Sequence, residues 1–142
     1  MKKIIILICI VVVIIATFAY VYNSKMYTLK LAIQKKEFYE SYLQKEITGI
    51  EVASIINKVV DENEKNKAIK NTRGMDEKNN KNNIELEISF IDNDKTYTIN
   101  EIYNSGIDKF VQYYGQIIFK CTDIIYHTNT QSISKIIFAQ VN

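Results

Sequence analysis

The sequence holds few side chains of the kinds that enzymes use as acids, bases and nucleophiles. His127 is the single histidine, and it lies in a polar stretch between two β-rich runs, where a turn residue is more common than a catalytic base or a metal ligand. A zinc site needs three or four nitrogen and sulfur ligands, and His127 and Cys121 supply only two. We therefore predict no metal site and no histidine-based catalysis.

Two acidic groupings could in principle bind calcium or catalyse acid–base chemistry. Residues 92–94 begin like a calcium-binding loop, but Tyr97 stands where the sharp turn needs glycine, and Tyr103 stands where the bidentate glutamate belongs. Glu85 and Glu87 alternate with apolar residues, which places them on the solvated face of a strand without a second carboxylate cluster. The sequence therefore predicts no catalytic residue, no cofactor and no metal, and we expect a protein that is not an enzyme.

Tyrosine is the abundant side chain that could form a binding surface. The chain has ten tyrosines, and Tyr103, Tyr113 and Tyr126 lie in segments that could converge. Aromatic surfaces bind sugars or anchor the side chains of protein partners. Tyr114 shares an apolar helical stripe with Phe110, so core packing is the expectation for that residue. The candidate partner-binding residues are therefore Tyr103, Tyr113 and Tyr126.

A membrane anchor is the clearest element that the sequence predicts. Residues 4–22 are uncharged and almost all aliphatic; Lys2 and Lys3 precede them, and the polar residues 23–25 follow. A helix of about 20 apolar residues matches the roughly 30 Å hydrocarbon thickness of a bilayer. A cleavable signal peptide is the alternative, but its apolar region usually runs about 7 to 15 residues and ends at a small-residue cleavage site. The longer run favours a retained signal anchor at residues 1–24 that binds the lipid bilayer.

The orientation of the anchor follows from its flanks. Counting lysines does not decide it, because Lys2 and Lys3 precede the span and four lysines follow within residues 25–36. A short N-terminal tail with two lysines is hard to translocate, and Tyr20 and Tyr22 would lie in the aromatic belt at the outer interface. We predict a single-pass protein of the cell membrane with a cytoplasmic N-terminus and an extracytoplasmic C-terminal domain.

The residues after the anchor suit one domain without net charge. Without Lys2 and Lys3 the 18 basic residues fall to 16, which equals the 16 acidic residues. A neutral domain gives no electrostatic case for a nucleic acid or for anionic lipid as the main partner. Cys9 lies inside the apolar run and Cys121 far downstream, so no disulfide framework is expected. This cysteine usage is consistent with the envelope of a low-GC Gram-positive bacterium.

Two helices are expected beyond the span. Residues 25–46 are good helix formers without Pro or Gly, and they predict a helical stalk continuous with the anchor. Leu31 and Phe38 share one face of that stalk, which packs either on the domain's own sheet or in an intermolecular coil. Thr48 and Glu51 then fit a capping box that begins a core helix. An apolar stripe at helical spacing follows, formed by Val52, Ile55, Ile56, Val59 and Val60.

The rest of the chain predicts a loop and two hairpins within a small extracytoplasmic domain, residues 47–142. Residues 63–83 are polar and rich in Asn and Lys, which indicates a loop, with a short strand around residues 67–70 as an option. Residues 84–90 alternate apolar and polar side chains as a half-buried strand does, and they can form a hairpin with residues 96–99 across the turn at residues 92–95.

The segment between the hairpins predicts two short helices. Asn100 is the expected N-cap of the first, which ends at Gly106, and the second ends at Gly115. Residues 117–126 and 132–141 then form the terminal hairpin. This order of elements predicts an α+β fold in which the helices cover one face of a four-stranded antiparallel sheet built from the two hairpins.

A hydrophobic N-terminal helix that continues into a domain with a four-stranded antiparallel sheet resembles the layout of type IV pilins and pseudopilins. The sequence lacks their processing motif, because residues 1–3 lead directly into the apolar run and no glutamate lies near its start. The resemblance implies a subunit or an accessory factor of an envelope assembly.

Several short stretches carry a second resemblance: residues 47–53, 57–58, 62–66, 119–121 and 126–127. Through them the sequence is similar to small single-pass envelope proteins of unknown function from low-GC Gram-positive bacteria. The similarity implies an envelope location and no activity.

The anchor, the neutral domain and the scarcity of catalytic groups predict a membrane-anchored, non-enzymatic interaction module with a protein partner. The alternative is a surface-displayed domain that binds a wall polymer or a soluble ligand through the polar loop and the exposed tyrosines.

Overall fold

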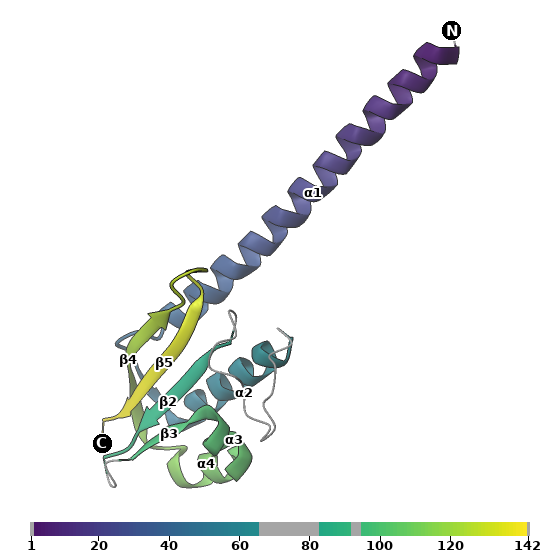
Figure 1. The fold of residues 1–142 in the computed structure, drawn as a ribbon. Coiled ribbons are helices and arrows are strands. Elements are labelled where there is room, and N and C mark those ends of the chain that lie inside the picture. Colours follow the sequence, from purple (N-terminus) through teal and green to yellow (C-terminus); the bar gives the residue numbers. More distant parts are fainter. Residues whose placement is uncertain (1, 66–82, 92–94, 142) are drawn as a thin grey trace. The chain divides into compact units, whose positions relative to one another are not determined.

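The computed structural model describes residues 2–65, 83–91 and 95–141. The chain divides into two compact units, Met1–Glu37 and Phe38–Asn142, and each is described by itself (Figure 1). The predicted strand at residues 67–70, the turn at residues 92–94 and most of the predicted loop at residues 63–83 lie outside the described residues.

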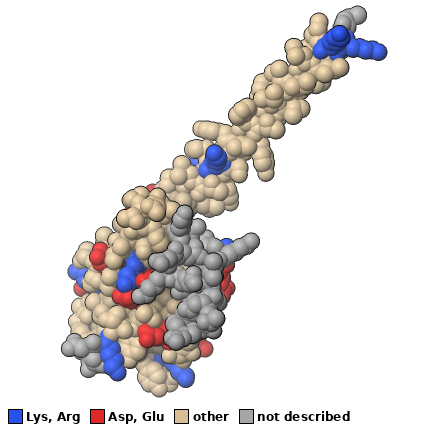
Figure 2. All heavy atoms as spheres, in the orientation of Figure 1, with Lys and Arg blue, Asp and Glu red and all other residues tan. Residues whose placement is uncertain are grey.

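The first unit is part of a single continuous helix, α1, which spans Lys2–Glu40. Within the described residues, α1 is the one helix that is long and apolar enough to cross a membrane, and none of the described side chains in its most apolar window is buried. Figure 2 shows the basic groups at the N-terminal end of α1, followed by a long stretch without charge. α1 is therefore compatible with a single-pass membrane anchor.

α1 ends at Glu40, earlier than the expected helical segment at residues 25–46. The chain leaves the helix in a turn in which Gln44 has a left-handed φ of 62°. The Gln44 backbone N–H donates to the carbonyl of Cys121 at 2.8 Å, so a contact far along the sequence replaces the next helical hydrogen bond. Local helix propensity is overridden here by a tertiary contact.

The described residues of the second unit form a five-stranded sheet in the order β1-β4-β5-β2-β3. Its strands are β1 (Glu46–Thr48), β2 (Glu85–Ser89), β3 (Thr96–Thr98), β4 (Ile118–Tyr126) and β5 (Ile133–Gln140). Both predicted hairpins are present, since β2 pairs antiparallel with β3 and β4 pairs antiparallel with β5.

The predicted four-stranded antiparallel sheet is wrong in two respects. The hairpins join through a parallel pairing of β2 with β5, which makes the sheet mixed. A fifth strand, β1, pairs antiparallel with β4 at the opposite edge. Both errors have the same physical cause: each pairing joins segments that are far apart in the sequence, and β1 is too short to show an alternating pattern. The coarser prediction of an α+β fold with a long N-terminal apolar helix is confirmed.

The helices α2 (Gly49–Lys65), α3 (Ile99–Ser105) and α4 (Ile107–Tyr114) accompany the sheet, with α3 and α4 near β3 (Figure 1). The predicted apolar stripe of α2 is buried at Val52, Ile55, Ile56 and Val59, and half-buried at Val60. The sheet contributes inward-facing side chains that include Leu86, Ile88, Phe119, Ile136 and Phe138. Packing of this stripe on the sheet forms the core.

Each of the two edge strands, β1 and β3, leads directly into a helix that begins with a capping box. The Glu51 carboxylate accepts the Thr48 backbone N–H at 2.8 Å, and the Thr48 hydroxyl accepts the Glu51 N–H, which confirms the predicted box. An equivalent box joins Thr98 and Glu101 at the start of α3, so the predicted N-cap at Asn100 is wrong. Thr98 and not Asn100 is the N-cap because Glu101, three residues after Thr98, accepts the Thr98 backbone N–H and completes the capping box. In both places the last backbone N–H of an edge strand is occupied by a carboxylate.

Asn63, near the end of α2, fastens the helix to the start of β2. Its side-chain amide donates to the Ile84 carbonyl at 2.9 Å, and its side-chain oxygen accepts the Ile84 N–H at 2.9 Å. Asn63 is only 3% exposed, so these bonds lie away from water. The amide thus supplies Ile84 with the pair of bonds that a neighbouring strand would supply.

Candidate binding site

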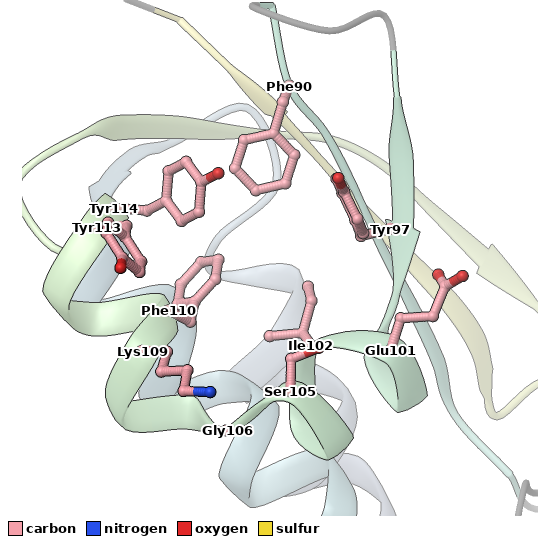
Figure 3. A pocket seen from close by; sticks show the side chains of 10 residues that line it. All are labelled: Phe90, Tyr97, Glu101, Ile102, Ser105, Gly106, Lys109, Phe110, Tyr113 and Tyr114. Carbon is pink, nitrogen blue, oxygen red and sulfur yellow. The ribbon is translucent and has the colours of Figure 1, made fainter.

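An aromatic pocket lies between the end of the β2–β3 hairpin and the two short helices (Figure 3). Its volume is about 230 Å³, which is below the roughly 300 to 1,000 Å³ typical of sites for drug-sized ligands. The pocket is therefore sized for one ring or one large side chain. Its lining residues are Phe90, Tyr97, Glu101, Ile102, Ser105, Gly106, Lys109, Phe110, Tyr113 and Tyr114.

The floor of the aromatic pocket is part of the hydrophobic core. Phe90, Ile102 and Phe110 are each about 5% exposed. The Phe90 ring packs against Tyr114 with 4.6 Å between centroids, and against Tyr97 at 5.4 Å in an edge-on arrangement. Rings held in this way present fixed apolar faces to the opening, because each is braced by aromatic neighbours.

Gly106 sets the shape of the rim. It ends α3 and precedes α4 with φ of 100°, a conformation that side chains with a Cβ rarely adopt. The chain can therefore turn sharply between two short helices, which places Ser105 and Lys109 on either side of the turn and within the lining. Tyr113, one helical turn further on, is 70% exposed and forms part of the outer wall.

The two charged groups of the rim, Glu101 and Lys109, differ in whether other residues bind them. Hydrogen bonds from the backbone N–H and the hydroxyl of Thr98 lower the pKa of Glu101, and both bonds fall on one carboxylate oxygen. The Lys109 ammonium, in contrast, forms no ion pair or hydrogen bond within the part of the chain that the structure describes. The mouth therefore offers one cation and an acid that the helix cap already uses.

The three tyrosines predicted from the sequence do not lie together. Tyr113 lines the aromatic pocket, whereas Tyr103 is 46% exposed on α3 and is not part of the lining. Tyr126 lies at the opposite end of β4 from α4, where its hydroxyl donates to the Glu40 carboxylate. That hydrogen bond, with partial burial, raises the pKa of Tyr126 to about 12.

No sequence pattern indicated that Phe90, Tyr97 or Lys109 belong to a site. Phe90 and Tyr97 read as ordinary hairpin residues, although their positions on either side of the same turn are a usable signal for facing rings. Tyr114, predicted to pack in the core, is half-buried and joins the core to the aromatic pocket through its contacts with Phe90 and Phe110.

The acidic side chains of β2, the histidine and the buried cysteine have structural surroundings that account for them. Lys135 lies 2.7 Å from Glu87 and 3.9 Å from Glu85. The His127 Nε2 lies 3.0 Å from the Asn83 carbonyl, a distance that corresponds to donation from an Nε2–H. Burial raises the pKa of the Cys121 thiol to about 11, which keeps it protonated and unreactive at neutral pH.

The described residues were also compared with the side-chain groupings that bind metal ions. Among the described residues, no group of three or more His, Cys, Asp or Glu side chains could hold a metal ion. The aromatic pocket is therefore the feature from which a function can be argued.

Comparison with known proteins finds no matching family model, no matching curated protein and no matching solved structure.

Proposed function

We propose that the protein is a membrane-anchored interaction module that binds a protein partner through its aromatic pocket and takes part in a bacterial envelope assembly. The N-terminus lies in the cytoplasm, α1 crosses the cell membrane once, and the domain lies outside. This orientation is supported by Lys2 and Lys3 beside the N-terminal end of the span and by Tyr20 and Tyr22 at its other end.

The observation that carries the proposal is the way α1 enters the folded domain. Its last turn belongs to the second unit, where Tyr39 is 1% exposed. The Lys58 ammonium lies 3.2 Å from the centre of the Phe38 ring, and Glu40 accepts the Tyr126 hydroxyl. The end of α1, which follows the apolar stretch without an intervening segment of sequence, is thus part of the core of the second unit, which suits a domain that is tethered to the membrane.

The aromatic pocket supports a binding role over a catalytic one. Protein interfaces obtain most of their energy from a few apolar anchors that fill preformed pockets. The floor here is buried and apolar, and its rim carries hydroxyl groups, one engaged carboxylate and one ammonium. The layout of an anchor helix joined to an α+β domain is also the one that pilin-like assembly subunits use, although the sheet differs from theirs in its mixed pairing.

A photo-crosslinking residue placed at Tyr113 in living cells tests this function, with the same residue at Tyr103 as the matched control. Both tyrosines are exposed on adjacent helices, but only Tyr113 lines the aromatic pocket. We expect a discrete protein adduct from position 113 and none from position 103. An adduct from 113 that resists protease and yields to wall-degrading enzymes favours the wall-polymer alternative, for which the tyrosine and serine hydroxyls of the rim are the supporting observation. If position 113 yields no adduct at all, both the protein-partner function and the wall-polymer alternative are contradicted.

A further inference from the structure

We propose that the aromatic pocket binds the C-terminal residue of the partner, with an aromatic or large aliphatic side chain inside and its α-carboxylate beside Lys109. This inference rests on the proposed function and names the chemistry that the partner presents. It follows from the volume and floor of the pocket, from the charge at its mouth, and from the way the neighbouring edge strand is closed.

The volume limits the occupant to a single residue. A cavity of about 230 Å³ with Phe90, Ile102 and Phe110 as its floor holds one large apolar side chain. Polar or small residues would leave the apolar floor without a partner, so they are poor occupants.

The charge at the mouth selects an anion. Lys109 stands on α4 and Glu101 on α3, with Ser105 between them in the lining (Figure 3). The Glu101 carboxylate is already engaged by Thr98, while the Lys109 ammonium has no partner among the described residues. An incoming carboxylate therefore gains an ion pair with a Lys109 ammonium that no described residue binds, whereas Glu101 already accepts two hydrogen bonds on Oε2 and has only Oε1 left for an incoming amine.

The neighbouring edge strand favours a chain end over a passing strand. A peptide that continued past the pocket would be stabilised by pairing with β3, the edge strand beside it. β3 has only three residues, and the N–H of its last residue, Thr98, is occupied by Glu101. A C-terminal residue does not need backbone pairing with β3, because its carboxylate can bind to Lys109 instead.

The absence of tryptophan from the chain allows a direct test with fluorescent peptides. The probes are acetyl-Gly-Trp with a free carboxylate, acetyl-Gly-Trp amide, and acetyl-Trp-Glu amide, which places the acid on the following side chain. Each is titrated against the full-length protein in nanodiscs of neutral lipid, and the signal of empty nanodiscs is subtracted. Entry of the indole into the aromatic pocket shifts its emission to shorter wavelength.

We expect the free carboxylate to bind most tightly of the three. Amidation should weaken binding about two- to five-fold, the factor that corresponds to an exposed ion pair. Lys109→Met should remove the difference between acid and amide, whereas Lys65→Met at the far end of α2 should preserve it. Tyr113→Ala should weaken all probes by about five-fold or more through loss of one aromatic wall, while Tyr103→Ala should leave them unchanged.

Three results overturn the inference: no saturable binding of the free acid, equal binding of acid and amide to the native protein, or binding of acetyl-Trp-Glu amide as tight as that of the free C-terminal acid. The peptide titrations and the crosslinking experiment test different proposals, so either one can fail without the other. A protein adduct at position 113 together with any of these three results refutes the C-terminal chemistry and leaves the interaction role standing. Saturable binding of the free acid without an adduct refutes the cellular partner and leaves the pocket chemistry standing.

Discussion

Replacement of Asn63 by alanine should cost more stability than any exposed substitution on the same helix. The buried Asn63 side chain satisfies both backbone groups of Ile84, each at 2.9 Å. Its removal leaves a buried donor and a buried acceptor, and each unsatisfied group costs about 1 to 3 kcal/mol. Water that enters the space left by the amide offsets part of this, so we expect a loss of about 2 to 4 kcal/mol. That is a large share of the roughly 5 to 15 kcal/mol typical of a folded domain.

Urea unfolding of the full-length protein in detergent micelles measures this loss. Near-ultraviolet circular dichroism follows the domain, because the packed aromatic rings lie there and the signal does not depend on the helicity of α1. With a urea dependence of about 2 kcal/mol per molar, the middle of the typical range for small proteins, the midpoint should fall by roughly 1 to 2 M. Asn57→Ala, an exposed position on the same helix, should change the free energy of unfolding by less than about 0.5 kcal/mol.

Hydrogen exchange provides a second readout at the bond itself. The Ile84 amide should exchange faster in Asn63→Ala and remain protected in Asn57→Ala. If Asn63→Ala and Asn57→Ala unfold at the same urea concentration, or if the Ile84 amide keeps its protection in both, the claim that this amide fastens α2 to β2 is refuted.

Three further perturbations test the packing and the capping boxes. Gly49→Ala should destabilise the domain strongly and lower its urea midpoint, because a Cβ there would lie 1.9 Å from the carbonyl oxygen of Tyr114; an unchanged midpoint would show that the α2–α4 contact is looser than described. The pKa values of Glu51 and Glu101 are lowered by hydrogen bonds from their capping threonines, so their stabilisation is present above the unfolded-state pKa of about 4.5 and is lost as the pH falls through the lowered folded values. The double Gln variant should therefore show a weaker loss of stability below about pH 4.5 than the native protein in acid titrations, and an identical acid profile would contradict the boxes. Tyr126→Phe should cost about 1 kcal/mol in urea unfolding through loss of its hydrogen bond to the end of α1, and no measurable cost would mean that this bond does not hold the junction.

Elements with strong local signals were predictable from the sequence. The capping box at Thr48 and Glu51, followed by a stripe of apolar residues at helical spacing, predicted the start and the buried face of α2. Strict alternation predicted β2, and the glycines at 106 and 115 marked the ends of α3 and α4. In each case the pattern and the physical cause lie within a few residues of each other.

The elements that were missed depend on contacts between distant segments. β1 covers three residues, and their partners in β4 lie seventy or more positions later. The parallel pairing of β2 with β5 likewise has no local signature. The aromatic pocket was also missed, because Phe90 and Tyr97 have the residue types of a core and line a pocket only where the distant helices α3 and α4, joined at Gly106, pack beside them.

Labelling of a cysteine placed at Tyr113 with a membrane-impermeant maleimide, in intact cells stripped of their wall, tests whether an anchored domain lies outside the cell. The native thiols give little background, since Cys121 is buried and Cys9 lies within the apolar stretch of α1. We expect Tyr113→Cys to be labelled before lysis, on a chain that stays with the membrane after carbonate washing. Labelling that occurs only after lysis, or a labelled chain that carbonate releases, would contradict an anchored domain with its aromatic pocket outside the cell.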